Sequence, residues 1–205
     1  MFASSPCARL WTRFAPEPEK WAKGTWTIGA NRVPFGPRAW QITFDATTPV
    51  ELLRDVHTEL LDLYHQDQLF EDATAPHEVY TPLLARGWSH SIKTDGTQTF
   101  HAPDGEGNVQ HRYTAPTGSD PIWRAWAGYS REPLWQARFS SGAPTTLAAA
   151  LTASLVSSEQ LHRVVKDIPF FTRRHLYVAS AAAQQLPSHS TPAQPPTAPV
   201  VGRTR

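Results

Sequence analysis

An internal repeat constrains the fold of this 205-residue chain more than any other feature. The segment WQITFDATTPVELLRDVHTEL at residues 40–60 returns as WQARFSSGAPTTLAAALTASL at residues 135–155. In both copies Trp-Gln opens an alternating segment that ends at Phe, a short polar turn follows, and Pro precedes an apolar run. A strand, turn and helix that occur twice predict two related units that share a core.

Strict alternation marks the first repeated segment as a strand with one buried face. Trp40, Ile42 and Phe44 alternate with the polar residues Gln41 and Thr43. A period of two is typical of an antiparallel sheet that is covered on one side and wet on the other. The same alternation separates Leu10, Thr12 and Phe14 from Arg9, Trp11 and Arg13 near the start of the chain.

The helix after this strand has a recognisable start. Thr48-Pro49-Val50-Glu51 predicts a capping box, in which the Thr48 side chain accepts from an early helical N–H. Leu52, Val56 and Leu60 then form an apolar stripe that should cover the Trp40 face of the strand. The second copy has Ala143 in place of the capping threonine, so we expect a weaker cap on its helix.

These elements together predict an α+β fold. Each of the two related units is expected to be a three- or four-stranded antiparallel meander followed by a helix packed on one face. Pro82 to Gly87 suggests one or two additional helical turns at the start of the second unit. The expected boundaries are 1–66 for an N-terminally shortened first repeat, 67–79 for a linker, 80–182 for the second repeat with a C-terminal strand, and 183–205 for a disordered Pro-rich tail.

The net charge and the cysteine content limit where this protein can reside and what it can bind. A formal charge of +1 provides no general attraction to nucleic acid or to anionic membranes, so such binding would need a local patch. The single cysteine, Cys7, excludes an internal disulfide and fits a reducing compartment. The most apolar segment, residues 147–156, is far shorter than the roughly 20 residues that span a bilayer. We expect a cytoplasmic protein without membrane contact, and the sequence leaves its oligomeric state open.

A larger pattern links both copies to a known family. Its second copy consists of Gly87-Trp88, an Ala-Pro-Asp-Gly turn at residues 102–105, Trp123, the strand at 133–139 and the helix at 144–155. The first copy has Ser5-Pro6, Trp26, the strand at 40–44 and the helix at 49–60, but Cys7-Ala8 stands where the pattern has Asp-Gly. This combination resembles the SPDY-type domain of unknown function, which occurs singly or in tandem in actinomycete proteins. The resemblance implies the fold units and no activity.

The sequence contains none of the common catalytic signatures, whether nucleophile elbow, zinc-protease helix, phosphate loop or paired cysteines. We therefore expect no enzyme and no cofactor. Three weaker groups each have a simpler structural interpretation. Two of these groups could ligate a cation or form a polar site: His65, Asp67, Glu71 and Asp72 in the linker, and His101, Asp104 and His111 around a turn. The third is Cys7, which could be a nucleophile if a base lay nearby.

Two function hypotheses remain. The first is a non-catalytic binding or scaffolding protein whose partner is a protein, held on the polar faces of the strands by residues such as Gln41, Thr43, Gln136 and Arg138. The second is single-stranded nucleic-acid binding by a segment in which cations and aromatics alternate. That segment contributes Arg163, Lys166, Phe170, Arg173, Arg174, His175 and Tyr177, which could equally close the second core and form its wet side.

Overall fold

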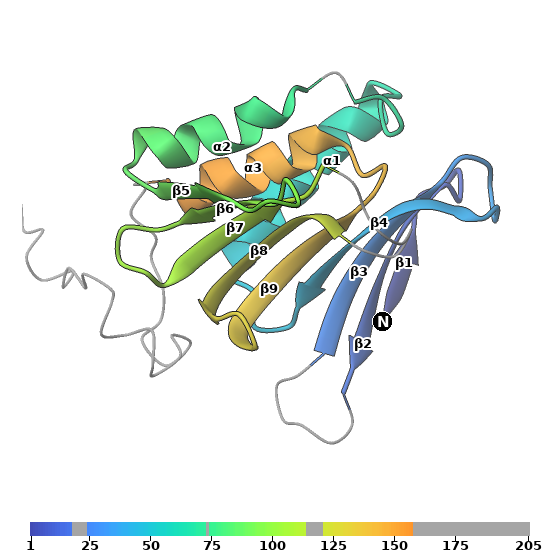
Figure 1. The fold of residues 1–205 in the computed structure, drawn as a ribbon. Coiled ribbons are helices and arrows are strands. Elements are labelled where there is room, and N and C mark those ends of the chain that lie inside the picture. The colour runs from blue at the N-terminus through green and yellow to red at the C-terminus, as the bar shows by residue number, and fades with distance from the viewer. Residues whose placement is uncertain (18–23, 73, 114–120, 158–205) are drawn as a thin grey trace, which may run out of the picture. The chain divides into compact units, whose positions relative to one another are not determined.

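The computed structural model describes residues 1–17, 24–72, 74–113 and 121–157. The expected C-terminal strand, the basic aromatic segment at 162–177 and the expected tail at 183–205 lie outside the described residues. Within the described part, the α+β prediction is confirmed, because three helices accompany a single antiparallel sheet (Figure 1).

The described residues form one nine-stranded sheet in which each repeat supplies a contiguous half. Its strands follow the order β1-β2-β3-β4-β9-β8-β7-β6-β5, and every neighbouring pair is antiparallel. The strands are β1 (Phe2–Ser4), β2 (Leu10–Pro16), β3 (Gly24–Asn31), β4 (Arg38–Asp45), β5 (Ser89–Ile92), β6 (Gln98–His101), β7 (Gly107–His111), β8 (Pro121–Tyr129) and β9 (Glu132–Ser140).

The two repeats meet at their last strands. β4 pairs with β9 at three register positions: Ile42 with Phe139, Thr43 with Arg138, and Phe44 with Ala137. The rings of Phe44 and Phe139 meet edge to face beside this seam, with centroids 6.2 Å apart. The shared core expected from the repeat is therefore continuous, because the two half-sheets join edge to edge.

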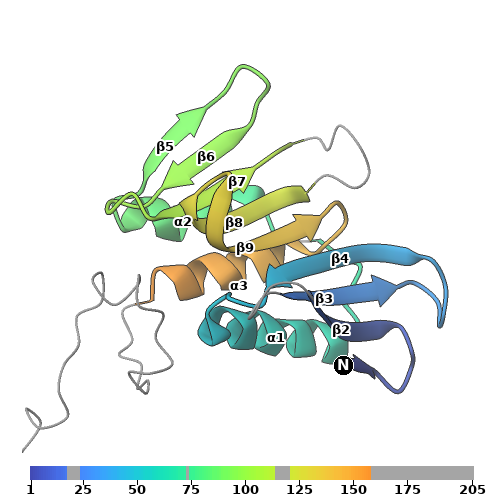
Figure 2. The ribbon, with the colours of Figure 1, turned by 90° about the horizontal axis from the view of Figure 1, so that it is seen from below.

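Three helices cover one face of the sheet (Figures 1 and 2). They are α1 (Val50–His65), α2 (Pro76–Ala85) and α3 (Thr145–Leu155), and α3 packs against both of the others. The predicted alternation and helical stripe are confirmed, since one core buries Trp40, Ile42, Phe44, Leu52, Val56 and Leu60. In the described part of the chain, no helix is both long and apolar enough to cross a membrane.

The predicted capping box at Thr48 is wrong. Pro49 occupies the cap position of α1, and no side chain of the cap bonds to the helix. The hydroxyl of Thr48 instead lies 3.5 Å from the carbonyl oxygen of Gln136, and that of Thr47 donates to the carbonyl of Leu134 at 2.7 Å. The turn after β4 is packed against β9 of the other repeat, so strand carbonyls replace the helix as partners of these hydroxyls.

The second repeat's helix gains a cap from a distant residue. Asp72 accepts the backbone N–H of Thr145 at 3.0 Å and the Thr145 hydroxyl at 2.6 Å. A carboxylate at this position also complements the positive end of the helix dipole. The expected weakness of this helix start is therefore offset, and Asp72 has a structural duty in place of the cation-ligand role weighed above.

The helix α2 is longer than the one or two turns expected after Tyr80. It begins at Pro76, within the segment assigned to the linker, and runs for 10 residues. Glu78 accepts the backbone N–H of Ala75 at 3.1 Å, and proline at the first helical position needs no hydrogen-bond acceptor for its nitrogen. The chain then leaves the helix through Gly87, whose φ of 79° suits glycine.

Candidate functional site

A row of polar and basic side chains crosses the sheet on the face that the described helices leave uncovered. Neighbours in the row are register partners in adjacent strands, and cross-strand partners point to the same side. At strand spacings of about 4.8 Å the row is roughly 34 Å long. This polar row consists of Arg13, Thr27, Thr43, Arg138, Arg124, Gln110, Thr99 and Ser91, from β2 to β5.

The centre of the polar row carries two arginines side by side. Arg124 and Arg138 are direct partners between β8 and β9. The amide oxygen of Gln136 accepts from both guanidinium groups at 3.2 Å, so one uncharged side chain fixes the pair. Arg124 also donates to the carbonyl of Ser130 at 3.2 Å and lies 4.6 Å above the ring of Trp126. The two cations are thus held in place by neutral groups.

The electrostatics of this pair leave positive charge on the sheet face. Burial lowers the pKa of Arg124, and the nearby charges of Arg138 and Arg112 lower it further. Asp45 is the acidic group whose charge acts on both central arginines, but burial raises its pKa despite hydrogen bonding from Gln136. Among the described residues the ion pairs join Arg9 to Asp67 and Arg54 to Asp55, so neither central arginine has a carboxylate within 4.0 Å.

Two of the residues expected to contact a ligand, Gln136 and Arg138, lie on this face. Thr43 belongs to the polar row, and Gln41 lies on the same face because it is two residues away in β4. The backbone N–H of Gln41 donates to the hydroxyl of Ser140 at 2.8 Å. The other expected contacts, Arg163, Lys166, Phe170, Arg173, Arg174, His175 and Tyr177, lie outside the described residues. The sequence interpretation missed Arg124 and Trp126, although their alternation within β8 places them on one face.

The turn-associated histidines and acids do not form a shared site. His101 Nδ1 lies 2.7 Å from the amide oxygen of Asn108, and Asp104 accepts the backbone N–H of Glu106 within its own turn. His111 is buried and stacks on Trp123. In the described ranges, no three histidine, cysteine, aspartate or glutamate side chains gather as a metal site would require.

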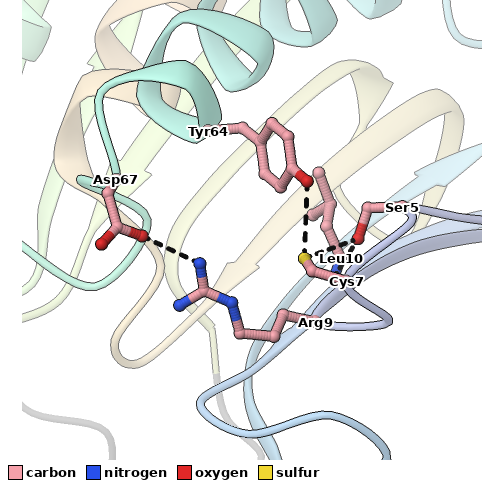
Figure 3. Close-up of polar contacts among 6 residues, drawn as sticks. All are labelled: Ser5, Cys7, Arg9, Leu10, Tyr64 and Asp67. Carbon is pink, nitrogen blue, oxygen red and sulfur yellow. Dashed lines mark hydrogen bonds and ion pairs between the residues drawn. The ribbon is translucent and has the colours of Figure 1, made fainter.

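Cys7 lies in a small polar cluster between the first turn and α1 (Figure 3). The Tyr64 hydroxyl donates to the Cys7 sulfur at 3.4 Å, and the Ser5 hydroxyl lies 3.2 Å from it. The guanidinium group of Arg9 extends past the thiol and donates to the carboxylate of Asp67 at 2.8 Å. Hydrogen bonds from Ser5, then Tyr64, then the Arg9 backbone lower the pKa of Cys7 to about 6. The neighbours of the thiol are therefore donors that stabilise a thiolate, rather than the base considered for a nucleophile.

The same turn in the second repeat explains why Cys7 is placed in this way. Ala8 N–H bonds to the Ser5 carbonyl and Gly105 N–H to the Ala102 carbonyl, each at 2.9 Å. Ala8 has a φ of 53° where Gly105 has 77°, so an alanine adopts the conformation that favours glycine. The sequence departure at Cys7-Ala8 thus leaves the turn in place and puts a thiol where Asp104 has a carboxylate.

The ionisation of Cys7 is directly testable, because it is the only cysteine of the chain. The rate of alkylation by iodoacetamide, followed by intact mass, should rise with pH around a midpoint near 6. Removing a donor by Tyr64→Phe should shift that midpoint upward, whereas Tyr129→Phe, at a ring that is 87% exposed, should leave it unchanged. A wild-type midpoint near 8.5 would contradict the stabilised thiolate.

Comparison with known proteins agrees with the two halves of the sheet. One family model, SPDY, described as a domain of unknown function (DUF317), matches residues 4–65 and again residues 101–161. The first match runs from the last residue of β1 to the end of α1. The second runs from the last residue of β6 through β7, β8, β9 and α3, so α2, β5 and most of β6 lie between the two matches. No match was found among curated proteins or among solved structures. The chain therefore belongs to the SPDY (DUF317) family and carries two copies of its domain.

Proposed function

We propose that this protein is a non-catalytic binding protein and that its ligand contacts the face of the sheet opposite the helices. The observation that carries the proposal is the Arg124–Arg138 pair, in which two cations lie directly opposite each other without a carboxylate within 4.0 Å among the described residues. Like charges at directly opposed sheet positions cost stability. A ligand that brings negative charge to this place would remove that cost.

The ligand expected from the sequence is a protein, and acidic side chains on such a partner suit the arginines. Guanidinium groups bind carboxylates and phosphates through paired hydrogen bonds. Gln136 orients both arginines before a ligand arrives, which reduces the ordering cost of binding. A scaffolding role in the cytoplasm fits the two joined domains, the single free cysteine and the lack of catalytic signatures in the sequence. Single-stranded nucleic acid is the second candidate, because its phosphates suit the same arginines.

The test compares two variants with the same change in charge on opposite faces. Arg124→Gln/Arg138→Gln removes the central pair, whereas Arg54→Gln/Arg86→Gln removes two cations from the helical elements. The probes are a labelled peptide rich in Asp and Glu and a labelled single-stranded oligonucleotide, followed by fluorescence anisotropy. Wild type should bind at least one probe. The central variant should bind it at least about tenfold more weakly, since hydrogen bonds to charged groups contribute about 1.5–3 kcal/mol.

The control variant should bind as wild type does, and added salt should weaken wild-type binding. The proposal would be wrong if wild type bound neither probe, or if the two double variants behaved alike.

A further inference from the structure

Trp11 forms a flat aromatic surface at the β2 end of the helix-free face. It lies two residues from Arg13 on the same strand, so both side chains project from the same side. Its register partner is Gly29, where an added Cβ would lie only 2.2 Å from the indole ring. The ring therefore rests directly on the β3 backbone, which glycine alone permits. The ring of Phe2 extends this surface, with its centroid 6.3 Å from that of Trp11 and an angle of 23° between the planes.

An open pocket of about 780 Å³ lies at this aromatic surface. This volume is within the range of small-molecule sites, about 300–1,000 Å³, and exceeds what one ring requires. Two of its apolar side chains are strongly exposed, Phe2 at 66% and Phe35 at 90%. Its lining includes Phe2, Ser4, Trp11, Arg13, Asn31 and Phe35. The pocket thus combines ring surfaces with a guanidinium group.

The spacing of the arginines extends this site along the sheet. Arg138 and Arg124 lie three and four strands away from Arg13 in the polar row, at about 14 and 19 Å by strand spacing. Hydroxyl groups of Thr27 and Thr43 fill the interval. The face therefore presents an aromatic platform at one end and cations at both ends of a polar track.

This combination discriminates between the two classes of anionic ligand. An acidic protein segment would use the arginines but would have no need of a partly exposed indole lying flat on the sheet. Single-stranded nucleic acid needs both, because its phosphates pair with arginine and its unpaired bases stack on aromatic rings. In a duplex the bases already stack on one another, so the indole favours single strands.

We propose that single-stranded nucleic acid binds along the helix-free face, with a base stacked on Trp11 and phosphates at Arg13, Arg138 and Arg124. The inference rests on the proposed function: it keeps the same binding face and assigns to it the second of the two candidate ligands. Stacking on an indole distinguishes bases little, so the binding is tolerant of sequence.

The test measures the affinity for a labelled oligothymidylate of roughly 15 nucleotides by fluorescence anisotropy. Trp11→Leu should weaken binding about 5- to 150-fold, the range expected for the loss of one stacked base. Trp11→Phe should retain most of the affinity, because it keeps a ring. Tyr129→Leu, which removes an exposed aromatic from the end of β8, should bind as wild type does. Circular dichroism of each variant verifies that the sheet is intact.

The outcomes separate this inference from the proposed function. Binding of the acidic peptide but not of the oligothymidylate, lost in Arg124→Gln/Arg138→Gln, would overturn the nucleic-acid assignment and leave the binding surface standing. Unchanged affinity in Trp11→Leu would remove the stacking role, and equal affinity for a duplex of the same length would do so as well. Failure of both probes to bind wild type would overturn both proposals.

Discussion

Acidification from pH 6.5 to about pH 4 should destabilise this protein by up to about 3 kcal/mol through His111 alone. His111 is 3% exposed, and its ring stacks on Trp123 with centroids 4.0 Å apart. Burial lowers the pKa of its imidazole from 6.5 to about 4. Between these values the unfolded chain takes up a proton that the folded chain does not. Stability is therefore lost as the pH falls through this window, and the loss is complete below pH 4.

The contribution of His111 can be isolated with His111→Phe, which keeps a ring against Trp123. Carboxyl groups also titrate at low pH, so the measured quantity is the difference between wild type and variant in the free energy of unfolding, from urea melts at pH 7.5 and pH 4. The variant should be at least as stable as wild type at pH 7.5, because Nδ1 of His111 is buried with no hydrogen-bond partner in the described region. It should also lose less stability on acidification. His77→Gln, which removes an exposed histidine, should follow wild type at both pH values.

Truncation of Trp40 should cost about 3–5 kcal/mol of stability as Trp40→Ala, since this side chain is 2% exposed in the shared core. The milder Trp40→Phe should still cost about 1–3 kcal/mol. The reason is a buried hydrogen bond, in which the indole N–H donates to the carbonyl of Leu69 at 2.8 Å. Phenylalanine would leave that carbonyl without its donor.

The second repeat provides a matched control at the equivalent position. Trp135 is 8% exposed, and its indole N–H makes no hydrogen bond to another residue in the described ranges. Trp135→Phe should therefore cost clearly less than Trp40→Phe in urea or thermal unfolding. Equal costs for the two variants would show that packing volume, and not the bond to Leu69, decides the effect.

The sequence predicted those features whose cause is local. The alternation of Trp40, Ile42 and Phe44 and the stripe of Leu52 and Val56 reflect the period of one strand and one helix, and both are present in the structure. The capping box failed because its local rule competes with tertiary contacts, and the carbonyl of Gln136 lies where the Thr48 hydroxyl is directed. Repetition predicted that two units would be alike, but it contains no information on which edges pair.

The binding face was only partly predictable for a related reason. Gln136 and Arg138 follow from the alternation of their strand, whereas the Arg124–Arg138 pairing depends on the register between two strands. The sequence did contain a pattern that predicts the position of Trp126 on the face opposite the core. It is three residues from Trp123 in one strand, and an odd spacing places two residues on opposite faces, so one tryptophan had to leave the core side. The contact between Trp11 and Gly29 could not be predicted from the sequence, because it depends on the register between β2 and β3.

The seam between β4 and β9 also limits how this domain can be combined. Each repeat contributes its last strand to the seam, so a single pairing occupies the free edge of both strands. The first strands, β1 and β5, are then the edge strands of the described sheet. A third copy could not enter by the same contact. This contact therefore joins only two copies of the domain. A chain with one copy would have an unpaired last strand that a second chain could pair with. For such a chain we expect a homodimer that rebuilds the seam between molecules.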